Sequence, residues 1–434
     1  MTLKVQFTFL LVCATFLVNS QPLLMLNDAI KQALENNYDV QIAKNDQSIA
    51  DIQNNWGNAG RLPTVAATGG YNISNSNVFQ KLNTGVEIER KGATLQSENA
   101  GITAQWRIFN GFRVTAAKRR LEEQEIISNL GVKQQANETV YNVIVGYLNL
   151  MRLQLERKAL QETIALFQER MTLAQNRFTI GVAAKSDWLQ AQVDFNEQQN
   201  SLLQNELDTK AAITNLNNLM ARNADDNYMV TDTIERVNLP SRSNIIQVLD
   251  TLNPQLLIAK RNQLVLVQLS KEINAQRLPT LSLNTGVNLN NSNNSAGQLL
   301  RNTNYGPAAG LSLAVPIYSA GLVKQQLKVN SVQQKTQQVI YDQIKNDLQT
   351  SLANAFNSNE NAQKKYALEM ETLEVVKENN MIAMERFRKG SITTVELRQT
   401  QLNFIESQTR MINAMYQMKQ AEADILLIMG RLVQ

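Results

Sequence analysis

The chain carries an internal duplication that spans most of its 434 residues. Two early segments recur with an offset of 216 positions: Ile42-Ala43-Lys44 as Ile258-Ala259-Lys260, and Arg61-Leu62-Pro63-Thr64 as Arg277-Leu278-Pro279-Thr280. Later matches share an offset of 209: Ile108-Phe109 with Ile317-Tyr318, Arg177-Phe178 and Gly181 with Arg386-Phe387 and Gly390, and Gln190, Gln192 and Phe195 with Gln399, Gln401 and Phe404. Constant offsets predict two copies of one structural unit.

Each copy is predicted to contain a helix, a pair of strands and two long helices joined by a tight turn. The first copy covers 21–220, with a helix at 27–58, a strand pair at 62–109 and a helical hairpin at 112–220. The second covers 246–434, with a helix at 253–275, a strand pair at 278–318 and a hairpin at 321–430. A linker at 221–245 joins the copies.

Residues 1–20 have the pattern of a secretory signal peptide. Lys4 supplies a positive charge, 7–18 form an apolar run, and Ser20 is a small residue at a cleavage point. The apolar run is shorter than the ~20 residues of a membrane-spanning helix. We therefore expect an exported chain that begins near Gln21.

Cysteine and histidine usage argues against catalysis. The single cysteine, Cys13, lies in the leader, and Val12 stands where a lipoprotein leader has a small residue, so no lipid attachment is expected. Without histidine or a mature cysteine, the chain lacks the commonest general base, thiol nucleophile and zinc ligands, and we expect no enzyme activity and no cofactor. A net charge of +4, or +3 without Lys4, gives no reason to expect a nucleic-acid partner.

Four segments alternate apolar with small or polar residues at a period of two. Their apolar sets are Val65, Ala67, Gly69, Tyr71 and Ile73; Ala100, Ile102, Ala104, Trp106 and Ile108; Leu281, Leu283, Val287 and Leu289; and Tyr305, Ala309, Leu311, Leu313, Val315 and Ile317. A half-buried soluble sheet alternates in the same way, but the leader and the small residues opposite favour strands of an outer-membrane β-barrel.

Four strands are too few to enclose a water-filled channel. An open sheet in lipid would leave backbone groups at its edges unpaired, at a cost of several kcal/mol each. The chain is therefore expected to oligomerise, and three copies would supply twelve strands. The polar loops predicted at 75–93 and 291–303 would face the exterior.

The helical hairpins have an apolar seam with heptad spacing. In the first copy it comprises Leu160, Ile164, Phe167, Met171, Ala174 and Phe178, and in the second Leu373, Val376, Asn380, Ala383 and Phe387. A helix of about 67 residues is ~100 Å long at 1.5 Å per residue, which is too long for one compact core. The helices suit either the wall of a duct or a coiled-coil spacer.

The duplicated pattern resembles the TolC-type outer-membrane efflux proteins over essentially the whole mature chain. The most specific residues are the Leu-Pro-Thr segments at 62–64 and 278–280, the pairs Ile108-Phe109 and Ile317-Tyr318, and the Arg-Phe-x-x-Gly tips at 177–181 and 386–390. The resemblance implies a homotrimer with a twelve-stranded barrel in outer-membrane lipid and a periplasmic helical tunnel. It also implies a periplasmic adaptor and a proton-driven (RND) or ATP-driven (ABC) inner-membrane pump.

The resemblance also suggests gate residues at the closed end of the tunnel. In the best-known member a Thr-Asp pair of the first half is linked to a Tyr and an Arg of the second. Here Ser186 and Asp187 take the first positions, whereas Phe387 and Ile392 stand in place of Tyr and Arg. That member also has two acidic rings at the constriction. Here Glu396 keeps one of these positions, and Gln399 replaces the acidic residue of the other. A ring of Glu396 would favour cations, although a carboxylate at a helix start also simply stabilises that helix.

The hairpin tips are predicted to bind the adaptor. Gly181 and Gly390 each follow a long helix and are expected to adopt the left-handed conformation that ends it. Together with Arg177 and Arg386 they mark the docking tips. The predicted function is an exit duct for efflux or type I secretion. A passive porin or a coiled-coil envelope protein remains the alternative.

Overall fold

The computed structural model describes residues 22–231 and 238–432. The predicted leader, with Cys13, lies outside these residues, as does 232–237 of the predicted linker. No helix in these two ranges is both long and apolar enough to cross a membrane.

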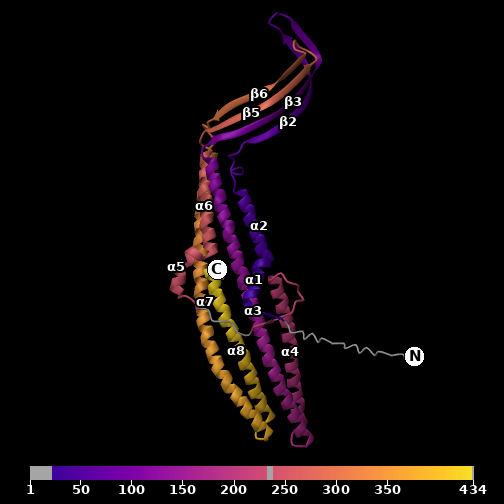
Figure 1. Ribbon diagram of the computed structural model, residues 1–434, viewed down its shortest axis with the longest axis vertical. Coiled ribbons are helices and arrows are strands. Elements are labelled where there is room, and N and C mark those ends of the chain that lie inside the picture. Colours follow the sequence, from indigo (N-terminus) through magenta and orange to yellow (C-terminus); the bar gives the residue numbers. More distant parts are fainter. Residues whose placement is uncertain (1–21, 232–237, 433–434) are drawn as a thin grey trace, which may run out of the picture. The chain divides into compact units, whose positions relative to one another are not determined.

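The helices and strands follow one another in the same order in both halves (Figure 1). The first series is β1 (Leu23–Leu24), α1 (Leu26–Asn36), α2 (Tyr38–Gln53), β2 (Thr64–Lys81), β3 (Glu87–Asn110), α3 (Arg113–Thr179) and α4 (Lys185–Leu219). The second is β4 (Met229–Val230), α5 (Arg242–Leu252), α6 (Pro254–Ala275), β5 (Thr280–Asn294), β6 (Arg301–Ala314), α7 (Leu322–Arg388) and α8 (Thr394–Met429). The helices α3 and α7 have 67 residues each.

The chain divides into two compact units, and each unit combines segments of both repeats. Of the described residues, one unit comprises 22–38, 138–231, 238–239 and 354–427, and so holds most of the two helical hairpins together with β1 and β4. The other comprises 39–137, 240–353 and 428–432 and holds the four long strands. The units therefore cut across the duplication, because each copy contributes half of each unit.

The four long strands form one antiparallel sheet in the order β2-β3-β5-β6. The hairpin of the first repeat joins that of the second through β3 and β5, with Ala100 opposite Leu289 and Ile102 opposite Val287. Cross-strand partners share a face, so the register collects the predicted apolar residues of the paired strands on one face of the sheet. The prediction was wrong for Val315 and Ile317, which lie beyond the end of β6, and Ile108 falls at a register shift of β3. The other face carries mainly Thr, Ser, Asn and Gly, with Arg107 opposite Ser282.

The strand pairs extend further than the sequence pattern predicts. Much of the polar segment predicted as a loop at 75–93 is strand: β2 runs to Lys81, and an ion pair of 2.7 Å joins Lys81 to Glu87 across the turn. The predicted loop at 291–303 shrinks to 295–300. Asn and Ser are poor strand formers, but here cross-strand hydrogen bonds hold them, as between Thr303 and Asn291 at 2.9 Å.

The first helix of each repeat is interrupted at an asparagine. α1 ends before Asn37, whose backbone is extended (φ −59°, ψ 132°) and whose amide donates to the carbonyl of Leu219 at 2.9 Å. Asn253 stands between α5 and α6 and donates to the carbonyl of Ile428 at 2.9 Å. The asparagines are 216 positions apart and their acceptors 209, so the duplication preserved this contact. The single helix predicted at 27–58 is therefore two.

In the unit that holds most of the hairpins, a buried tyrosine on α3 contacts the short strands β1 and β4. Tyr147 is fully buried; its hydroxyl donates to the carbonyl of Leu24 at 2.9 Å and accepts from the N–H of Thr231 at 3.0 Å. Leu24 and Val230 are register partners in the parallel pair of β1 and β4. One hydroxyl thus fixes two short strands against α3.

Candidate functional site

The two hairpin tips have the same backbone structure. Gly181 has φ +80°; its N–H donates to Phe178 and the next N–H to Arg177, both at 2.9 Å. Gly390 has φ +76°, and its N–H and the next donate to Phe387 and Arg386 at 2.9 and 2.8 Å. This hydrogen-bond pair is the Schellman motif, which places a glycine in the left-handed region at the helix end. The predicted conformation of both glycines is confirmed.

The residues at the positions suggested for an inter-helix latch form no such link among the described residues. Ser186 is exposed and Asp187 half-buried in the first turn of α4, and the described residues give Asp187 no ion-pair partner. Phe387 is buried in an apolar cluster at the tip of the second hairpin, and Ile392 packs against that cluster. The residues that replace Tyr and Arg therefore contribute to apolar packing.

Glu396 has a structural partner at the start of α8. Its carboxylate accepts from the N–H of Thr393 at 3.1 Å, and the hydroxyl of Thr393 accepts from the N–H of Glu396 at 3.2 Å. This reciprocal pair is a capping box, which satisfies two backbone donors at the helix start. Gln399, which replaces the second ring acid, donates to the side chain of Asn403 at 2.9 Å.

The two tip arginines differ in their surroundings. Arg177 is half-buried, with its guanidinium 5.1 Å from the centre of the Phe387 ring, and it donates to the carbonyl of Phe387 at 3.4 Å. Arg386, the equivalent residue, is exposed. Of the two, only Arg177 connects the hairpins among the described residues.

A buried ion cluster below the tips was missed by sequence reasoning. Arg170 of α3 is fully buried and forms an ion pair with Asp194 of α4, which also pairs with Arg398 of α8 at 3.0 Å. Gln401 accepts from Arg170 at 2.9 Å, and Gln190 donates to Asp194 at 2.8 Å. One carboxylate thus joins three helices.

Burial lowers the pKa of Arg170, and the neighbouring Asp194 carboxylate opposes that shift. A guanidinium remains charged at neutral pH even so. Two arginines therefore share one carboxylate, and the Nε of Arg170 and Nε2 of Gln401 have no hydrogen-bond partner among the described residues. Removal of Asp194 would leave uncompensated charge inside the bundle.

The sequence did not predict this cluster because the buried face of α3 is not the one that the predicted apolar seam occupies. The buried residues of this stretch are Thr163, Phe167, Arg170 and Ala174, which also step by 4, 3 and 4. Of the predicted seam residues only Phe167 and Ala174 are buried. In α7 the predicted Asn380, Ala383 and Phe387 are buried. A charged residue at a seam position is indistinguishable from surface in a single sequence.

The profile of the outer membrane efflux protein family matches this chain twice, over residues 29–222 and 247–431. The chain belongs to the outer membrane efflux protein family. The two matches correspond to the two repeats, and the family assigns this chain to outer-membrane efflux, a transport function rather than an enzymatic one.

Solved structures with the same fold include outer-membrane channels. The chain superimposes on CusC with a TM-score of 0.77 (17% identity, 93% of this chain and 92% of the other). For the CmeC outer membrane channel of Campylobacter jejuni the TM-score is 0.79 (15% identity, 94% and 86%). For the outer membrane protein VceC of Vibrio cholerae it is 0.75 (15%, 93% and 96%). No curated protein matches the sequence significantly.

These matches confirm the TolC-type resemblance, the duplicated strand-and-hairpin fold and the outer-membrane location of this efflux protein. The roles suggested for Ser186, Asp187, Glu396 and the tip glycines stay predictions. What the geometry adds is a capping role for Glu396 and an ion cluster centred on Asp194.

Proposed function

We propose that three chains of this outer membrane efflux protein assemble through the free edges of β2 and β6. Three four-stranded sheets then close one twelve-stranded barrel, and the hairpins form a helical tunnel in the periplasm. Substrates enter from an inner-membrane pump of the RND or ABC type through a periplasmic adaptor and leave to the exterior, by efflux or type I secretion.

The observation that carries this proposal is a sheet with two open edges and an uncovered apolar face. Ile102, Val287 and Leu311 are 60%, 58% and 67% exposed, although they occupy the middle of the sheet. Lipid is the solvent in which such a face is stable, and in lipid each edge must find a partner strand. Because the four strands alternate in direction, β6 of one chain can pair antiparallel with β2 of the next.

Disulfide cross-linking between the sheet edges tests the assembly. A cysteine at Thr68 on β2 would be combined in turn with one at Ala308, Gly310 or Ser312 on β6, all on the small-residue face. At least one combination should give a ladder that ends at three chains. Thr68→Cys with Asn288→Cys is the control, because β3 separates the two strands. A ladder that runs past three, or no cross-link from any combination, would refute the trimer.

Contact with the adaptor is assigned to tip residues 181–187 and 390–396, together with Arg177 and Arg386. Arg386 is exposed beside the turn, so Arg386→Ala should abolish transport and adaptor cross-linking while trimer formation is unchanged. Lys364→Ala, at an exposed position of the same helix, is the matched control and should transport normally. Unaltered adaptor cross-linking in Arg386→Ala would contradict docking at this tip.

A further inference from the structure

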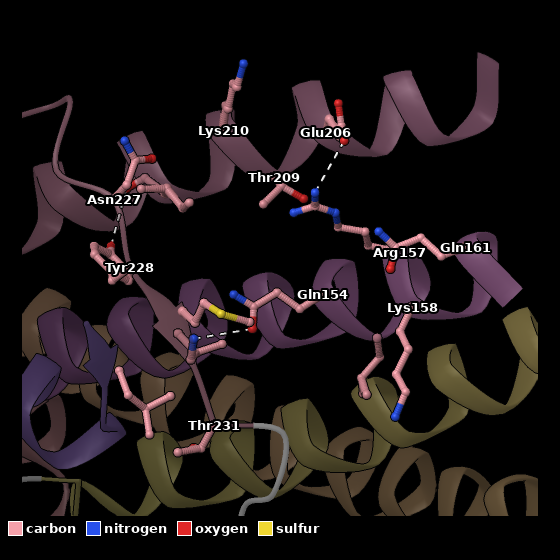
Figure 2. A pocket seen from close by; sticks show the side chains of 15 residues that line it. Gln154, Arg157, Lys158, Gln161, Glu206, Thr209, Lys210, Asn227, Tyr228 and Thr231 are labelled. Atoms are coloured by element: carbon pink, nitrogen blue, oxygen red, sulfur yellow. Dashed lines mark hydrogen bonds and ion pairs between the residues drawn. The ribbon is translucent and has the colours of Figure 1, made fainter. Parts of the chain in front are cut away.

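A cavity of about 750 Å³ lies in the hairpin unit, between α3 and α4 and beside the segment that contains β4 (Figure 2). It is separate from the tips, the ion cluster and the sheet. Its volume lies in the range of ~300–1,000 Å³ that is typical of sites for small organic ligands.

One end of the cavity is apolar. Ile213 of α4, Tyr228 and Val230 form it, and all three are buried. Leu155 of α3 and Leu23 of β1 also line the cavity. The strand pair that Tyr147 holds in place therefore supplies a preformed apolar wall, which suits a hydrocarbon or aromatic body.

The other end is polar and positively charged. Arg157 of α3 faces Thr209 and Glu206 of α4 (Figure 2), and its guanidinium lies 3.4 Å from the Glu206 carboxylate. That ion pair is long and both side chains are partly exposed, so it is weak. The hydroxyl of Thr209 is buried and has no hydrogen-bond partner in the described chain.

Two lysines add positive potential without filling the cavity. Figure 2 shows Lys210 and Lys158 extending away from the gap on opposite sides. Together with Arg157 they give the lining three cations against the single carboxylate of Glu206. The net positive charge of the lining therefore favours an anion over a cation.

We propose that this cavity binds a small amphiphilic organic anion, one molecule per chain. Its carboxylate or sulfonate accepts from the guanidinium of Arg157, in better geometry than Glu206 provides, and from the hydroxyl of Thr209. Its apolar body lies against Ile213, Tyr228 and Val230. The ligand bridges α3, α4 and β4 within one chain, so the site needs neither the trimer nor an adaptor.

The test compares two fluorescent probes with related aromatic systems. The anion is 1-anilinonaphthalene-8-sulfonate, and the uncharged counterpart is N-phenyl-1-naphthylamine. Both are titrated against the full chain in lipid nanodiscs, with empty nanodiscs as the blank. The anion should bind saturably with one site per chain, and Arg157→Gln should weaken it about tenfold while binding of the uncharged probe changes less than about twofold.

Further variants separate the site from surface charge. Lys158→Gln with Lys210→Gln should weaken the anion about two- to threefold at low salt and leave it unchanged at 1 M salt, because a rim charge is screened. Lys364→Gln, on an exposed part of α7, should bind as the parent does. Anion binding that equals the empty nanodiscs, or that is insensitive to Arg157→Gln, would overturn the proposal.

Discussion

The two helical hairpins share their backbone turns but differ in the charge that they bury. Gly181 and Gly390 end α3 and α7 with the same pair of hydrogen bonds. Gln190 donates to Asp194 as Gln399 donates to Asn403, at 2.8 and 2.9 Å. Only the first hairpin buries charged side chains at this level: Arg170 and Asp194 are buried and correspond to residues 379 and 403, which are both asparagines.

The shared turns follow from the backbone of each hairpin, whereas the buried charges of the first hairpin depend on a residue of the other hairpin. The turns are retained because a glycine in the left-handed region ends each helix and satisfies its last carbonyls without steric cost. The charges of the first hairpin are completed by Arg398 of the other hairpin. Asn403, the equivalent residue of the second hairpin, is exposed, and no ion pair forms there among the described residues. The buried ion pair of the first hairpin therefore also serves the contact between the two hairpins, through Arg398.

The largest expected effect comes from removing the shared carboxylate. Asp194→Asn leaves the buried Arg170 without a counter-charge inside the bundle, and the free energy of unfolding should fall by about 3–5 kcal/mol. Denaturant unfolding followed by fluorescence of Trp188, which stacks on Phe178 near the tip, measures it. The repeat-equivalent control Asn403→Asp should change stability by less than about 0.5 kcal/mol, because that site is exposed. Equal losses of unfolding free energy in Asp194→Asn and Asn403→Asp would contradict the difference between the two hairpins.

Replacement of both charges by apolar residues sharpens the comparison. Arg170→Met combined with Asp194→Leu removes the ion pair without leaving an isolated buried charge, and Arg398 is exposed enough to reach solvent. The double variant should be more stable than the sum of the two single losses predicts, by about 0.5–3 kcal/mol. A double-mutant cycle measures this coupling. Additive losses would mean that the two residues act independently.

A pH dependence is expected from a second contact between the two hairpins, whose Tyr and Asp are not retained at the equivalent positions of the duplication. Tyr141 donates to Asp424 at 2.7 Å, whereas the equivalent positions hold Thr350 and Asn215. Burial, and then the hydrogen bond to Asp424, raises the pKa of Tyr141 from 10 to about 12. The contribution to stability is complete below pH ~10 and is lost as the pH rises toward 12.

Tyr141→Phe should therefore flatten the alkaline decline of the unfolding midpoint between pH 10 and 12. The substitution also removes one hydrogen bond, at a cost of about 1 kcal/mol at neutral pH. Parallel melts of parent and variant across this range separate the two effects. An unchanged alkaline slope would show that Tyr141 does not titrate with unfolding.

The smallest effect concerns the starts of α4 and α8. Glu396→Ala breaks the capping box with Thr393 and should cost about 1 kcal/mol, whereas Asp187→Ala at the equivalent position should cost less, because no side chain caps α4. Glu396→Gln keeps the box and removes the charge. If a ring of Glu396 lines the trimer, Glu396→Gln should lower the cation preference of the channel without changing its melting temperature. An unchanged reversal potential would leave Glu396 with its capping role alone.

Local sequence patterns predicted the strands and the hairpin tips of this fold. The features that the sequence did not predict depend on residues far away in the chain. Alternation located four strands, and the glycines located both tips, because these features are local. The break at Asn37 depends on the carbonyl of Leu219, which is 182 residues away. The ion cluster depends on Arg398 of another hairpin meeting Asp194. Neither partner is visible from the neighbouring residues, so a propensity argument continues the helix and treats Arg170 as surface.

Imaging of the purified full-length protein in lipid nanodiscs at a resolution that separates strands tests the central claim most directly. We expect three copies around one closed twelve-stranded barrel, with β6 of each chain paired antiparallel to β2 of the next and the apolar face toward lipid. A different number of copies, or a barrel in which β2 and β6 are not partners, would contradict it.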